Sequence, residues 1–247
     1  MLKVEGVAKA YKKAGLFSRE REQVLADIHF ACDYGECLGI IGESGSGKST
    51  LGRLVLGIEQ PDRGSILFEG ESVTERRGRA GKISAVFQDY TSSINPFYTV
   101  EAAIMESLRL IGMGGQEASD KLDFLLDQVG LDRSYRQKHP HELSGGEVQR
   151  VCIARAIATN PACIVLDEAI SSLDGSVQMQ VLQLLKQLGQ TYRMSYLFIT
   201  HDLQAAAYLC DRVMIVHRGR VVETVAVEQL KDVQSAYARK LLRMVML

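Results

Sequence analysis

LGIIGESGSGKST, residues 38–50, is the stretch that decides the fold of this chain of 247 residues. Its apolar first part predicts a buried strand that ends at Gly42, and the apolar residues after Ser49 follow a helical spacing. Between them, GESGSGKS matches the pattern GxxxxGK[ST] at every position. A strand, a glycine-rich loop and a helix in this order predict a phosphate-binding loop.

The residue types of this loop fit the chemistry of phosphate binding. Glycine lets backbone N–H groups turn toward phosphate oxygens, and the following helix adds the positive end of its dipole. We expect Lys48 to reach the β and γ phosphates and the Ser49 hydroxyl to ligate Mg²⁺, which prefers oxygen ligands. A merely flexible Gly/Ser loop is the alternative, but the flanking strand and helix argue against it. The expected nucleotide-binding residues are Gly42, Glu43, Ser44, Gly45, Ser46, Gly47, Lys48, Ser49 and Thr50.

A second apolar run, CIVL at 163–166, ends in the carboxylates Asp167 and Glu168. A buried strand brings its last side chains to the carboxyl edge of the sheet, where ligands bind in such folds. We expect Asp167 to hold Mg²⁺, directly or through water, and Glu168 to polarise the attacking water. Adjacent carboxylates are often only surface charge, but the apolar run before them argues against that here. The two motifs together predict a phosphate-loop NTPase without saying which.

Composition narrows the class of protein. Hydrophobic residues make up 46%, charged residues 24%, and the net charge is −1, so binding of nucleic acid through bulk positive charge is excluded, although a local basic patch is not. No stretch of about 18 apolar residues is free of charged residues, so we expect no segment that spans a bilayer. The N-terminus lacks the features of a signal peptide, so we expect a cytoplasmic protein. The five cysteines form no CxxC pair and are expected to be buried thiols rather than metal ligands.

The remaining pattern predicts an α/β fold. Buried strands that alternate with helices indicate a mainly parallel sheet, and the segment from about 89 to 160 is mainly helical. The expected strands are 2–7, 24–31, 38–41, 65–68, 163–166 and 196–199, with a hairpin of 212–217 and 220–224. The expected helices are 51–56, 100–129, 177–188 and 237–247.

The sequence LSGGEVQR, residues 143–150, resembles the LSGGQ signature of the ABC ATPases. The resemblance covers nearly the whole chain, because the other motifs of that family follow in the same order. It implies one ABC ATPase domain over 1–247, with a core of about 1–88 and 161–247, an N-terminal antiparallel β subdomain and a helical signature subdomain of about 89–160. It also implies that the signature faces the ATP of a second ABC subunit. Ser144 is equally a good N-cap for the following helix, and both interpretations can hold. The expected signature residues are Ser144, Gly145, Gly146 and Glu147, the last in place of the usual Gln.

Four more positions take roles that the resemblance implies. Tyr11 matches the aromatic residue that stacks on adenine, although a core or surface tyrosine is the alternative. Gln88 matches the residue that senses the γ-phosphate side, contributes to the metal site and reports to the membrane partner; a plain polar strand end is the alternative. His201 matches the histidine that contacts the γ-phosphate. Asp174 closes the segment SSLD, which links the two nucleotide sites. DEAI at 167–170 replaces the usual DEPT, without loss of a catalytic group.

The segment QDYTSSINPFYTV, residues 88–100, resembles QDPxxSLNPxxTV of the peptide and nickel importer branch. SAYARKLL at 235–242 resembles that branch's HPYTxxLL element. The sequence shows no cysteine-rich tail of the kind found in longer oligopeptide members, and in this it is more similar to the shorter nickel or metal-chelate members. An exporter or lipoprotein-release motor and a soluble ABC protein are the alternatives.

The importer resemblance implies the partners. They are a second ABC ATPase subunit, identical or different, two membrane permeases and, indirectly, an extracytoplasmic substrate-binding protein, with no nucleic acid. The implied location is the cytoplasmic face of the inner membrane, as a peripheral protein. Ile94, Phe97 and Tyr98 are apolar residues in a loop-like stretch, so we expect a surface to cover them: the chain's own helices or a permease helix.

Overall fold

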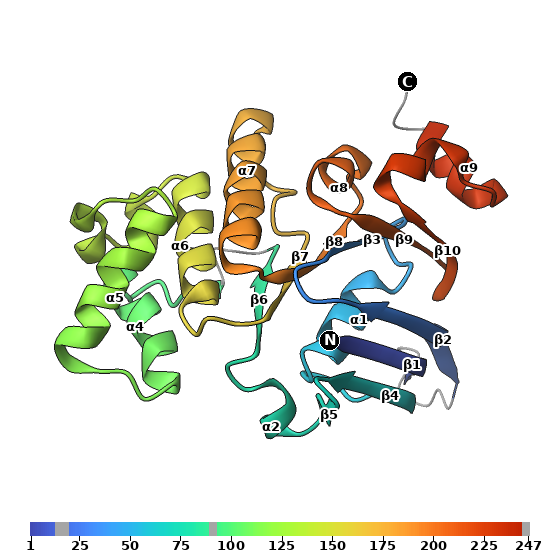
Figure 1. Cartoon of the computed structure of the whole chain (residues 1–247), viewed down its shortest axis with the longest axis horizontal. Coiled ribbons are helices and arrows are strands. Elements are labelled where there is room, and N and C mark those ends of the chain that lie inside the picture. Colours follow the sequence, from blue (N-terminus) through green and yellow to red (C-terminus); the bar gives the residue numbers. More distant parts are fainter. Residues whose placement is uncertain (13–19, 89–92, 244–247) are drawn as a thin grey trace. The chain divides into compact units, whose positions relative to one another are not determined.

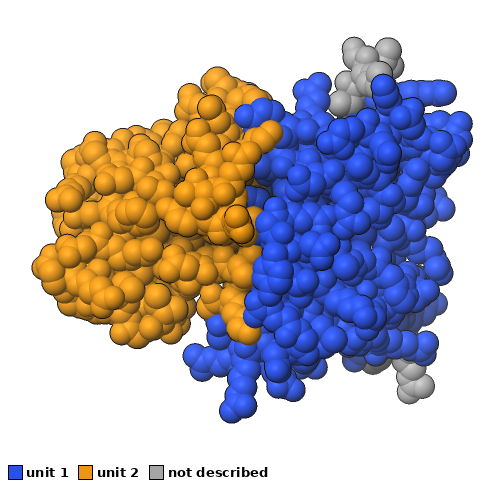
Figure 2. Space-filling model, in the orientation of Figure 1, with its two compact units in different colours: residues 1–80, 195–247 blue, residues 81–194 orange. Residues whose placement is uncertain are grey.

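The computed structural model describes residues 1–12, 20–88 and 93–243. The chain forms two compact units, of which unit 1 comprises Met1–Ala80 and Ser195–Leu247 and unit 2 comprises Gly81–Met194 (Figure 2). No helix of the described ranges is both long enough and apolar enough to cross a bilayer.

Unit 1 contains an antiparallel sheet in the order β2-β1-β4-β5 (Figure 1). Its strands are β1 (Leu2–Lys12), β2 (Arg21–Cys32), β4 (Arg63–Phe68) and β5 (Glu71–Ser72). One face is apolar and buried, with Leu2, Val4 and Val7 from β1 and Ile28 from β2. Leu2 and Val4 follow the period of two that predicted the strand, and a register shift in the pairing with β2 lies between Val4 and Val7.

A second group of strands in unit 1 is centred on β3 (Cys37–Ile41), which is buried along its whole length. β3 pairs in parallel with β8 (Ser195–Thr200) on one side and β9 (Arg212–His217) on the other. β10 (Arg220–Ala226) returns antiparallel to β9 through a turn at Arg218 and Gly219, so the predicted hairpin is confirmed. The helical elements of this unit are α1 (Lys48–Val55), α2 (Arg76–Arg79), α8 (Leu203–Leu209), the 3-10 segment Val227–Asp232 and α9 (Ala236–Arg243).

Unit 2 contains the parallel pair β6 (Ile83–Phe87) and β7 (Cys163–Asp167) together with most of the helical residues. Its helices are α4 (Val100–Leu110), α5 (Gly115–Gln128), α6 (Gly145–Ile157) and α7 (Gly175–Tyr192), with 3-10 turns at Arg133–Gln137 and Pro140–Glu142. Ile104, Leu122, Leu126 and Val151 are fully or almost fully buried and belong to the core of this unit.

The predicted fold class, α/β with a parallel-rich sheet and a separate antiparallel sheet, is confirmed. The compact units divide at residues 80/81 and 194/195, whereas the sequence placed subdomain limits near 89 and 160. The difference arises because β6, β7 and α7 group with the helices in unit 2. The narrower helical subdomain therefore stays a prediction.

Candidate active site

The phosphate loop connects the end of β3 to the start of α1, and glycine is required at two of its positions by space. A Cβ at Gly42 would lie 2.1 Å from the carbonyl oxygen of Val216. A Cβ at Gly47 would lie 2.6 Å from Leu25 Cδ2, and Gly47 also has a φ of 102°. Any other residue at these positions would force the backbone of the loop to shift.

The loop presents groups that suit phosphate oxygens. Lys48 is buried, and its Nζ donates to the carbonyl oxygens of Gly42 at 2.8 Å and Glu43 at 3.0 Å. No side chain of the described residues caps α1 at Gly47, where the positive end of the helix dipole lies. The buried Ser46 Oγ also has no hydrogen-bond partner in the described part of the chain. An anion with several acceptor oxygens would satisfy these donors, so the loop fits a nucleotide phosphate.

Two distant segments brace this loop. Gly219, in the β9–β10 turn, donates its N–H to the Ser46 carbonyl at 3.0 Å. The Glu43 N–H donates to the Tyr237 hydroxyl at 3.2 Å, across 194 positions of sequence. The Tyr237 ring contacts that of His217, with 3.8 Å between centroids. Sequence reasoning missed both braces; the resemblance of the segment around Tyr237 to HPYTxxLL was the available signal.

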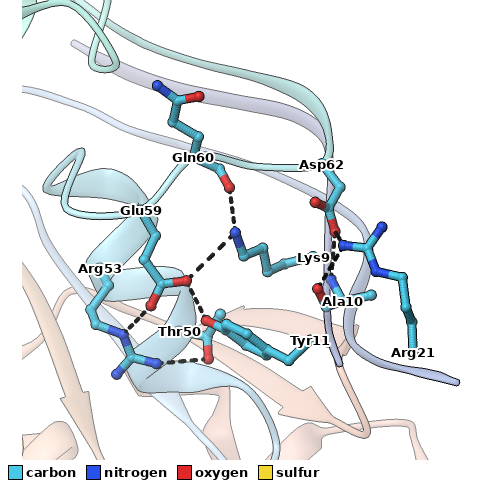
Figure 3. A network of polar contacts seen from close by, with 9 residues as sticks. All are labelled: Lys9, Ala10, Tyr11, Arg21, Thr50, Arg53, Glu59, Gln60 and Asp62. Carbon is cyan, nitrogen blue, oxygen red and sulfur yellow. Dashed lines mark hydrogen bonds and ion pairs between the residues drawn. The ribbon is translucent and has the colours of Figure 1, made fainter. Parts of the chain in front are cut away.

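Tyr11 lies near the end of β1 and is half-buried. Its hydroxyl donates to the Glu59 carboxylate, and Glu59 in turn contacts Arg53 on α1 (Figure 3). The sequence did not single out Glu59 or Arg53, because neither belongs to a recognised motif.

His201 follows β8 directly and is exposed. Ile41 of β3 and Thr200 of β8 are paired in parallel register, so the phosphate loop and His201 leave the sheet at the same edge. Asp202 then caps α8 by accepting N–H groups from Gln204 at 2.8 Å and Ala205 at 3.1 Å. Unit 1 thus brings the expected histidine to the edge that carries the loop.

In unit 2, the expected carboxylates lie where the parallel strands β6 and β7 end. Phe87 of β6 and Asp167 of β7 are paired in parallel register, so Gln88 follows β6 where Glu168 follows β7. Asp167 is buried, Glu168 is half-buried and Gln88 is exposed. Glu168 has a φ of 51°, rare for a residue with a side chain, and its carbonyl accepts the Ser171 hydroxyl at 2.9 Å. This geometry turns the chain sharply after the strand.

Ser144 is the N-cap of α6, as predicted, and forms a capping box with Glu147. The Glu147 carboxylate accepts the Ser144 N–H at 2.7 Å and the Ser144 hydroxyl at 2.8 Å. A hydrogen bond from the Tyr135 hydroxyl, followed by those from Ser144, lowers the pKa of Glu147 to about 2. The carboxylate that replaces glutamine is therefore ionised at neutral pH and holds the start of the signature helix.

The signature and Asp174 share one cavity within unit 2, with a volume of about 350 Å³. Its lining includes Ser144, Gly145, Gly146, Glu147 and Asp174. A Cβ at Gly146 would lie 2.5 Å from Val177 Cγ1, so glycine there permits the close approach of α6 to α7. The sequence predicted roles for these residues but not that they line one cavity.

The apolar residues after the segment 89–92, which lies outside the described residues, divide between core and surface. Ile94 is 2% exposed and belongs to the core of unit 2, so of the two alternatives the cover by the chain's own residues is confirmed for Ile94 and the cover by a permease helix is wrong. Phe97 is 85% exposed. The apolar pattern alone did not distinguish the two, because a short loop has no periodicity that sets an inward face.

Lys48, Ser49, Tyr11 and His201 lie in unit 1, whereas Gln88, Asp167, Glu168 and the signature lie in unit 2. Their arrangement around one nucleotide therefore remains a proposal. Among the described residues, no group of three or more His, Cys, Asp or Glu side chains is placed to hold a metal ion.

A loop of this form after a buried parallel strand and a carboxylate pair after another define a phosphate-loop NTPase, and a capped LSGGE helix is the mark of an ABC ATPase. Residues 25–171 match the family model for the ABC transporter, and the chain belongs to this family. It is an ATPase subunit whose hydrolysis of ATP drives transport.

The relatives place the chain in the predicted branch of peptide and nickel importers. It is 46% identical to the metal-staphylopine import system ATP-binding protein CntF of Staphylococcus aureus, over 98% of both chains. It is 39% identical to the nickel import ATP-binding protein NikE of Rhodospirillum rubrum, over 100% of this chain and 91% of that protein. The dimeric ATP-binding cassette MJ0796 bound to ADP and Pi is similar in structure, with a TM-score of 0.81 and 28% identity over 92% of this chain and 99% of that one.

Proposed function

We propose that the chain powers the import of nickel or a metal chelate, with a peptide as the second candidate cargo. The observation that carries the proposal is the 46% identity to a metal-staphylopine import protein over nearly the whole of both chains. The peptide alternative has a specific basis as well, since the oligopeptide transport protein AppF of Bacillus subtilis is 39% identical over 89% of this chain and 70% of that protein.

Uptake measurements separate these cargoes. Cells that produce the wild-type chain or Lys48→Ala at equal levels are given labelled nickel, a labelled nickel chelate or a labelled oligopeptide. The proposal expects the variant to lose uptake of a metal species while peptide uptake is unchanged. Loss of peptide uptake alone in the variant would establish the alternative. Uptake of each of the three labels that is the same in the variant as in the wild type would refute both.

The partners in this proposal are a second ABC ATPase subunit, two permeases and an extracytoplasmic binding protein. The chain would work on the cytoplasmic face of the inner membrane. The cavity lined by the signature and Asp174 supports the two-subunit part of the proposal. It lies at the N-terminus of α6, where helix N–H groups favour an anion. Because the phosphate loop of the chain already binds the chain's own ATP, this second surface suits the ATP of a partner.

Each site residue has a role in the proposed hydrolysis. Lys48 and the loop hold the phosphates, Tyr11 stacks on adenine, and His201 contacts the γ-phosphate. Ser49, Asp167 and Gln88 would hold Mg²⁺ through their side-chain oxygen atoms. The ion would neutralise part of the negative charge on the phosphates. Glu168 polarises the attacking water, while Ser144, Gly145 and Gly146 cover the ATP of the partner.

A hollow in unit 2 supports the contact with a permease. It has a volume of about 360 Å³ and lies between β6, α4 and α6, with Phe87, Ser93, Leu110 and Arg155 in its lining. Leu110 is 74% exposed, and the loop that leaves Ser93 carries the exposed Phe97. Leu110 is an uncovered apolar side chain in the lining of the hollow, and Phe97 is an uncovered one in the loop that follows Ser93. Both favour an apolar partner, here a short cytoplasmic helix of the permease.

Replacing Phe97 with glutamate is expected to abolish co-purification with the permeases and leave ATP binding within about twofold of wild type, because an exposed side chain contributes little to the fold. Phe124→Glu is the control, since Phe124 is a 41% exposed aromatic residue on α5, a helix that contributes no residue to the lining of the hollow and does not carry the loop of Phe97. A pull-down and an ATP-binding assay on the same protein test this. Permease recovery with Phe97→Glu equal to that with the control would refute the docking role.

A further inference from the structure

A chain of polar contacts connects Tyr11 to the first turn of α1 (Figure 3). The Tyr11 hydroxyl donates to Glu59 Oε2, and Glu59 Oε1 accepts from Arg53 Nε at 2.7 Å. Arg53 Nη2 then donates to Thr50 Oγ1 at 3.2 Å. All four residues lie in unit 1, and Thr50 directly follows Ser49 of the phosphate loop.

Lys9 closes this network from the side of β1. Its Nζ donates to the Gln60 carbonyl at 2.6 Å and lies 3.6 Å from Glu59 Oε2. The same ammonium lies 5.5 Å from the centroid of the Tyr11 ring, so a base that stacks on Tyr11 would use the opposite face. The ring is therefore held at its hydroxyl and contacted on one face.

The Glu59 carboxylate carries a charge at neutral pH. Burial raises its pKa, but the Tyr11 hydroxyl, Arg53 and Lys9 together outweigh burial and leave the pKa below its ordinary value. The Glu59 side chain is 23% exposed, so its hydrogen bonds are partly shielded from water. Hydrogen bonds to a charged and partly buried acceptor are stronger than those between neutral groups.

We propose that Glu59 is a positioning residue for nucleotide binding: it fixes the Tyr11 ring through its hydroxyl and ties that ring, through Arg53, to Thr50 at the phosphate end of the site. The inference rests on the proposed stacking of adenine on Tyr11. A ring already held in one orientation has less freedom to lose when the base binds, so the affinity for the nucleotide increases.

The neighbouring pair of Arg21 and Asp62 provides a matched control. Asp62 Oδ2 accepts the Ala10 N–H at 2.8 Å and Arg21 Nη2 at 2.9 Å, so it also ties β1 to the segment after α1. Unlike Glu59, it bonds to the backbone of β1 rather than to the Tyr11 side chain (Figure 3). A general loosening of β1 would follow from loss of either carboxylate, whereas loss of ring orientation would follow from loss of Glu59 alone.

The test is equilibrium binding of ATP and of inorganic tripolyphosphate to the full chain, measured by calorimetry. Tripolyphosphate reports on the phosphate loop without a base. We expect Glu59→Ala to weaken ATP binding about 10-fold and to leave tripolyphosphate binding unchanged. Tyr11→Phe should cost about the same, and the double variant no more than either single one, since each removes the same contact. Glu59→Gln should recover most of the ATP affinity because its amide oxygen still accepts the hydroxyl.

Three results would overturn the inference: ATP affinity of Glu59→Ala equal to wild type, an equal loss in Asp62→Ala, or a parallel loss of tripolyphosphate binding. Tyr11→Ala distinguishes failure of the inference from failure of the underlying proposal. If Tyr11→Ala binds ATP as wild type does, adenine does not stack on Tyr11 and both fail. If it binds ATP weakly while Glu59→Ala does not, only the positioning role of Glu59 fails.

Discussion

Replacing Glu168 with glutamine is expected to slow ATP hydrolysis by about 10²–10⁴-fold while ATP still binds, because general-base catalysis is typically of this size. Glutamine keeps the shape of the side chain but cannot take up the proton of the attacking water. The positive φ of Glu168 belongs to the backbone and would be as strained with glutamine, so the variant should fold as the wild type does.

Steady-state turnover and equilibrium ATP binding, measured on the same assembly, test this prediction. Glu117→Gln is the control, since Glu117 is an exposed carboxylate on α5 in the same unit. Wild-type turnover in Glu168→Gln would show that another group polarises the water.

Lys48→Ala is expected to weaken ATP binding by about 10²-fold or more. The Lys48 side chain is buried, and its ammonium group donates to two carbonyl oxygens of the phosphate loop. The ammonium group therefore lies against the backbone of the loop that binds the phosphates. Hydrogen bonds to charged groups contribute about 1.5–3 kcal/mol each, and loss of two such bonds to phosphate accounts for the expected decrease in affinity.

Calorimetry with ATP measures the effect, and the thermal unfolding midpoint shows whether the loop variant is folded. Lys3→Ala, on the exposed face of β1, removes the same charge far from the loop in sequence and serves as the control. ATP affinity equal to that of Lys3→Ala would mean that the phosphate loop is wrongly assigned.

The parts of the site that follow from short segments could be predicted from sequence. Gly42 and Gly47 were expected because a phosphate loop needs backbone without Cβ, and the structure shows the contacts that a Cβ would violate. Ser144 was expected as an N-cap because a serine before an apolar helix commonly accepts its first N–H groups, and it does so.

The parts that depend on distant segments could not be predicted. Tyr237 contacts the backbone of Glu43, and Glu59 contacts Tyr11, although neither pair is close in sequence. Such contacts arise from the path of the chain in three dimensions, and local residue patterns do not specify which distant residue either tyrosine contacts. The two alternatives for the cover of Ile94 stayed open for a related reason: its burial depends on packing within unit 2, and the sequence of its own loop does not specify that packing.

The central claim is that hydrolysis needs two subunits, because the signature of one covers the ATP held by the phosphate loop of the other. The most direct test is the ATPase rate per chain over a dilution series of the purified motor assembly, with its mass followed by light scattering. We predict that the rate per chain falls as the assembly dissociates and returns when the separated ATPase subunits are concentrated together. A full rate per chain in a sample that light scattering shows to be monomeric would contradict the claim.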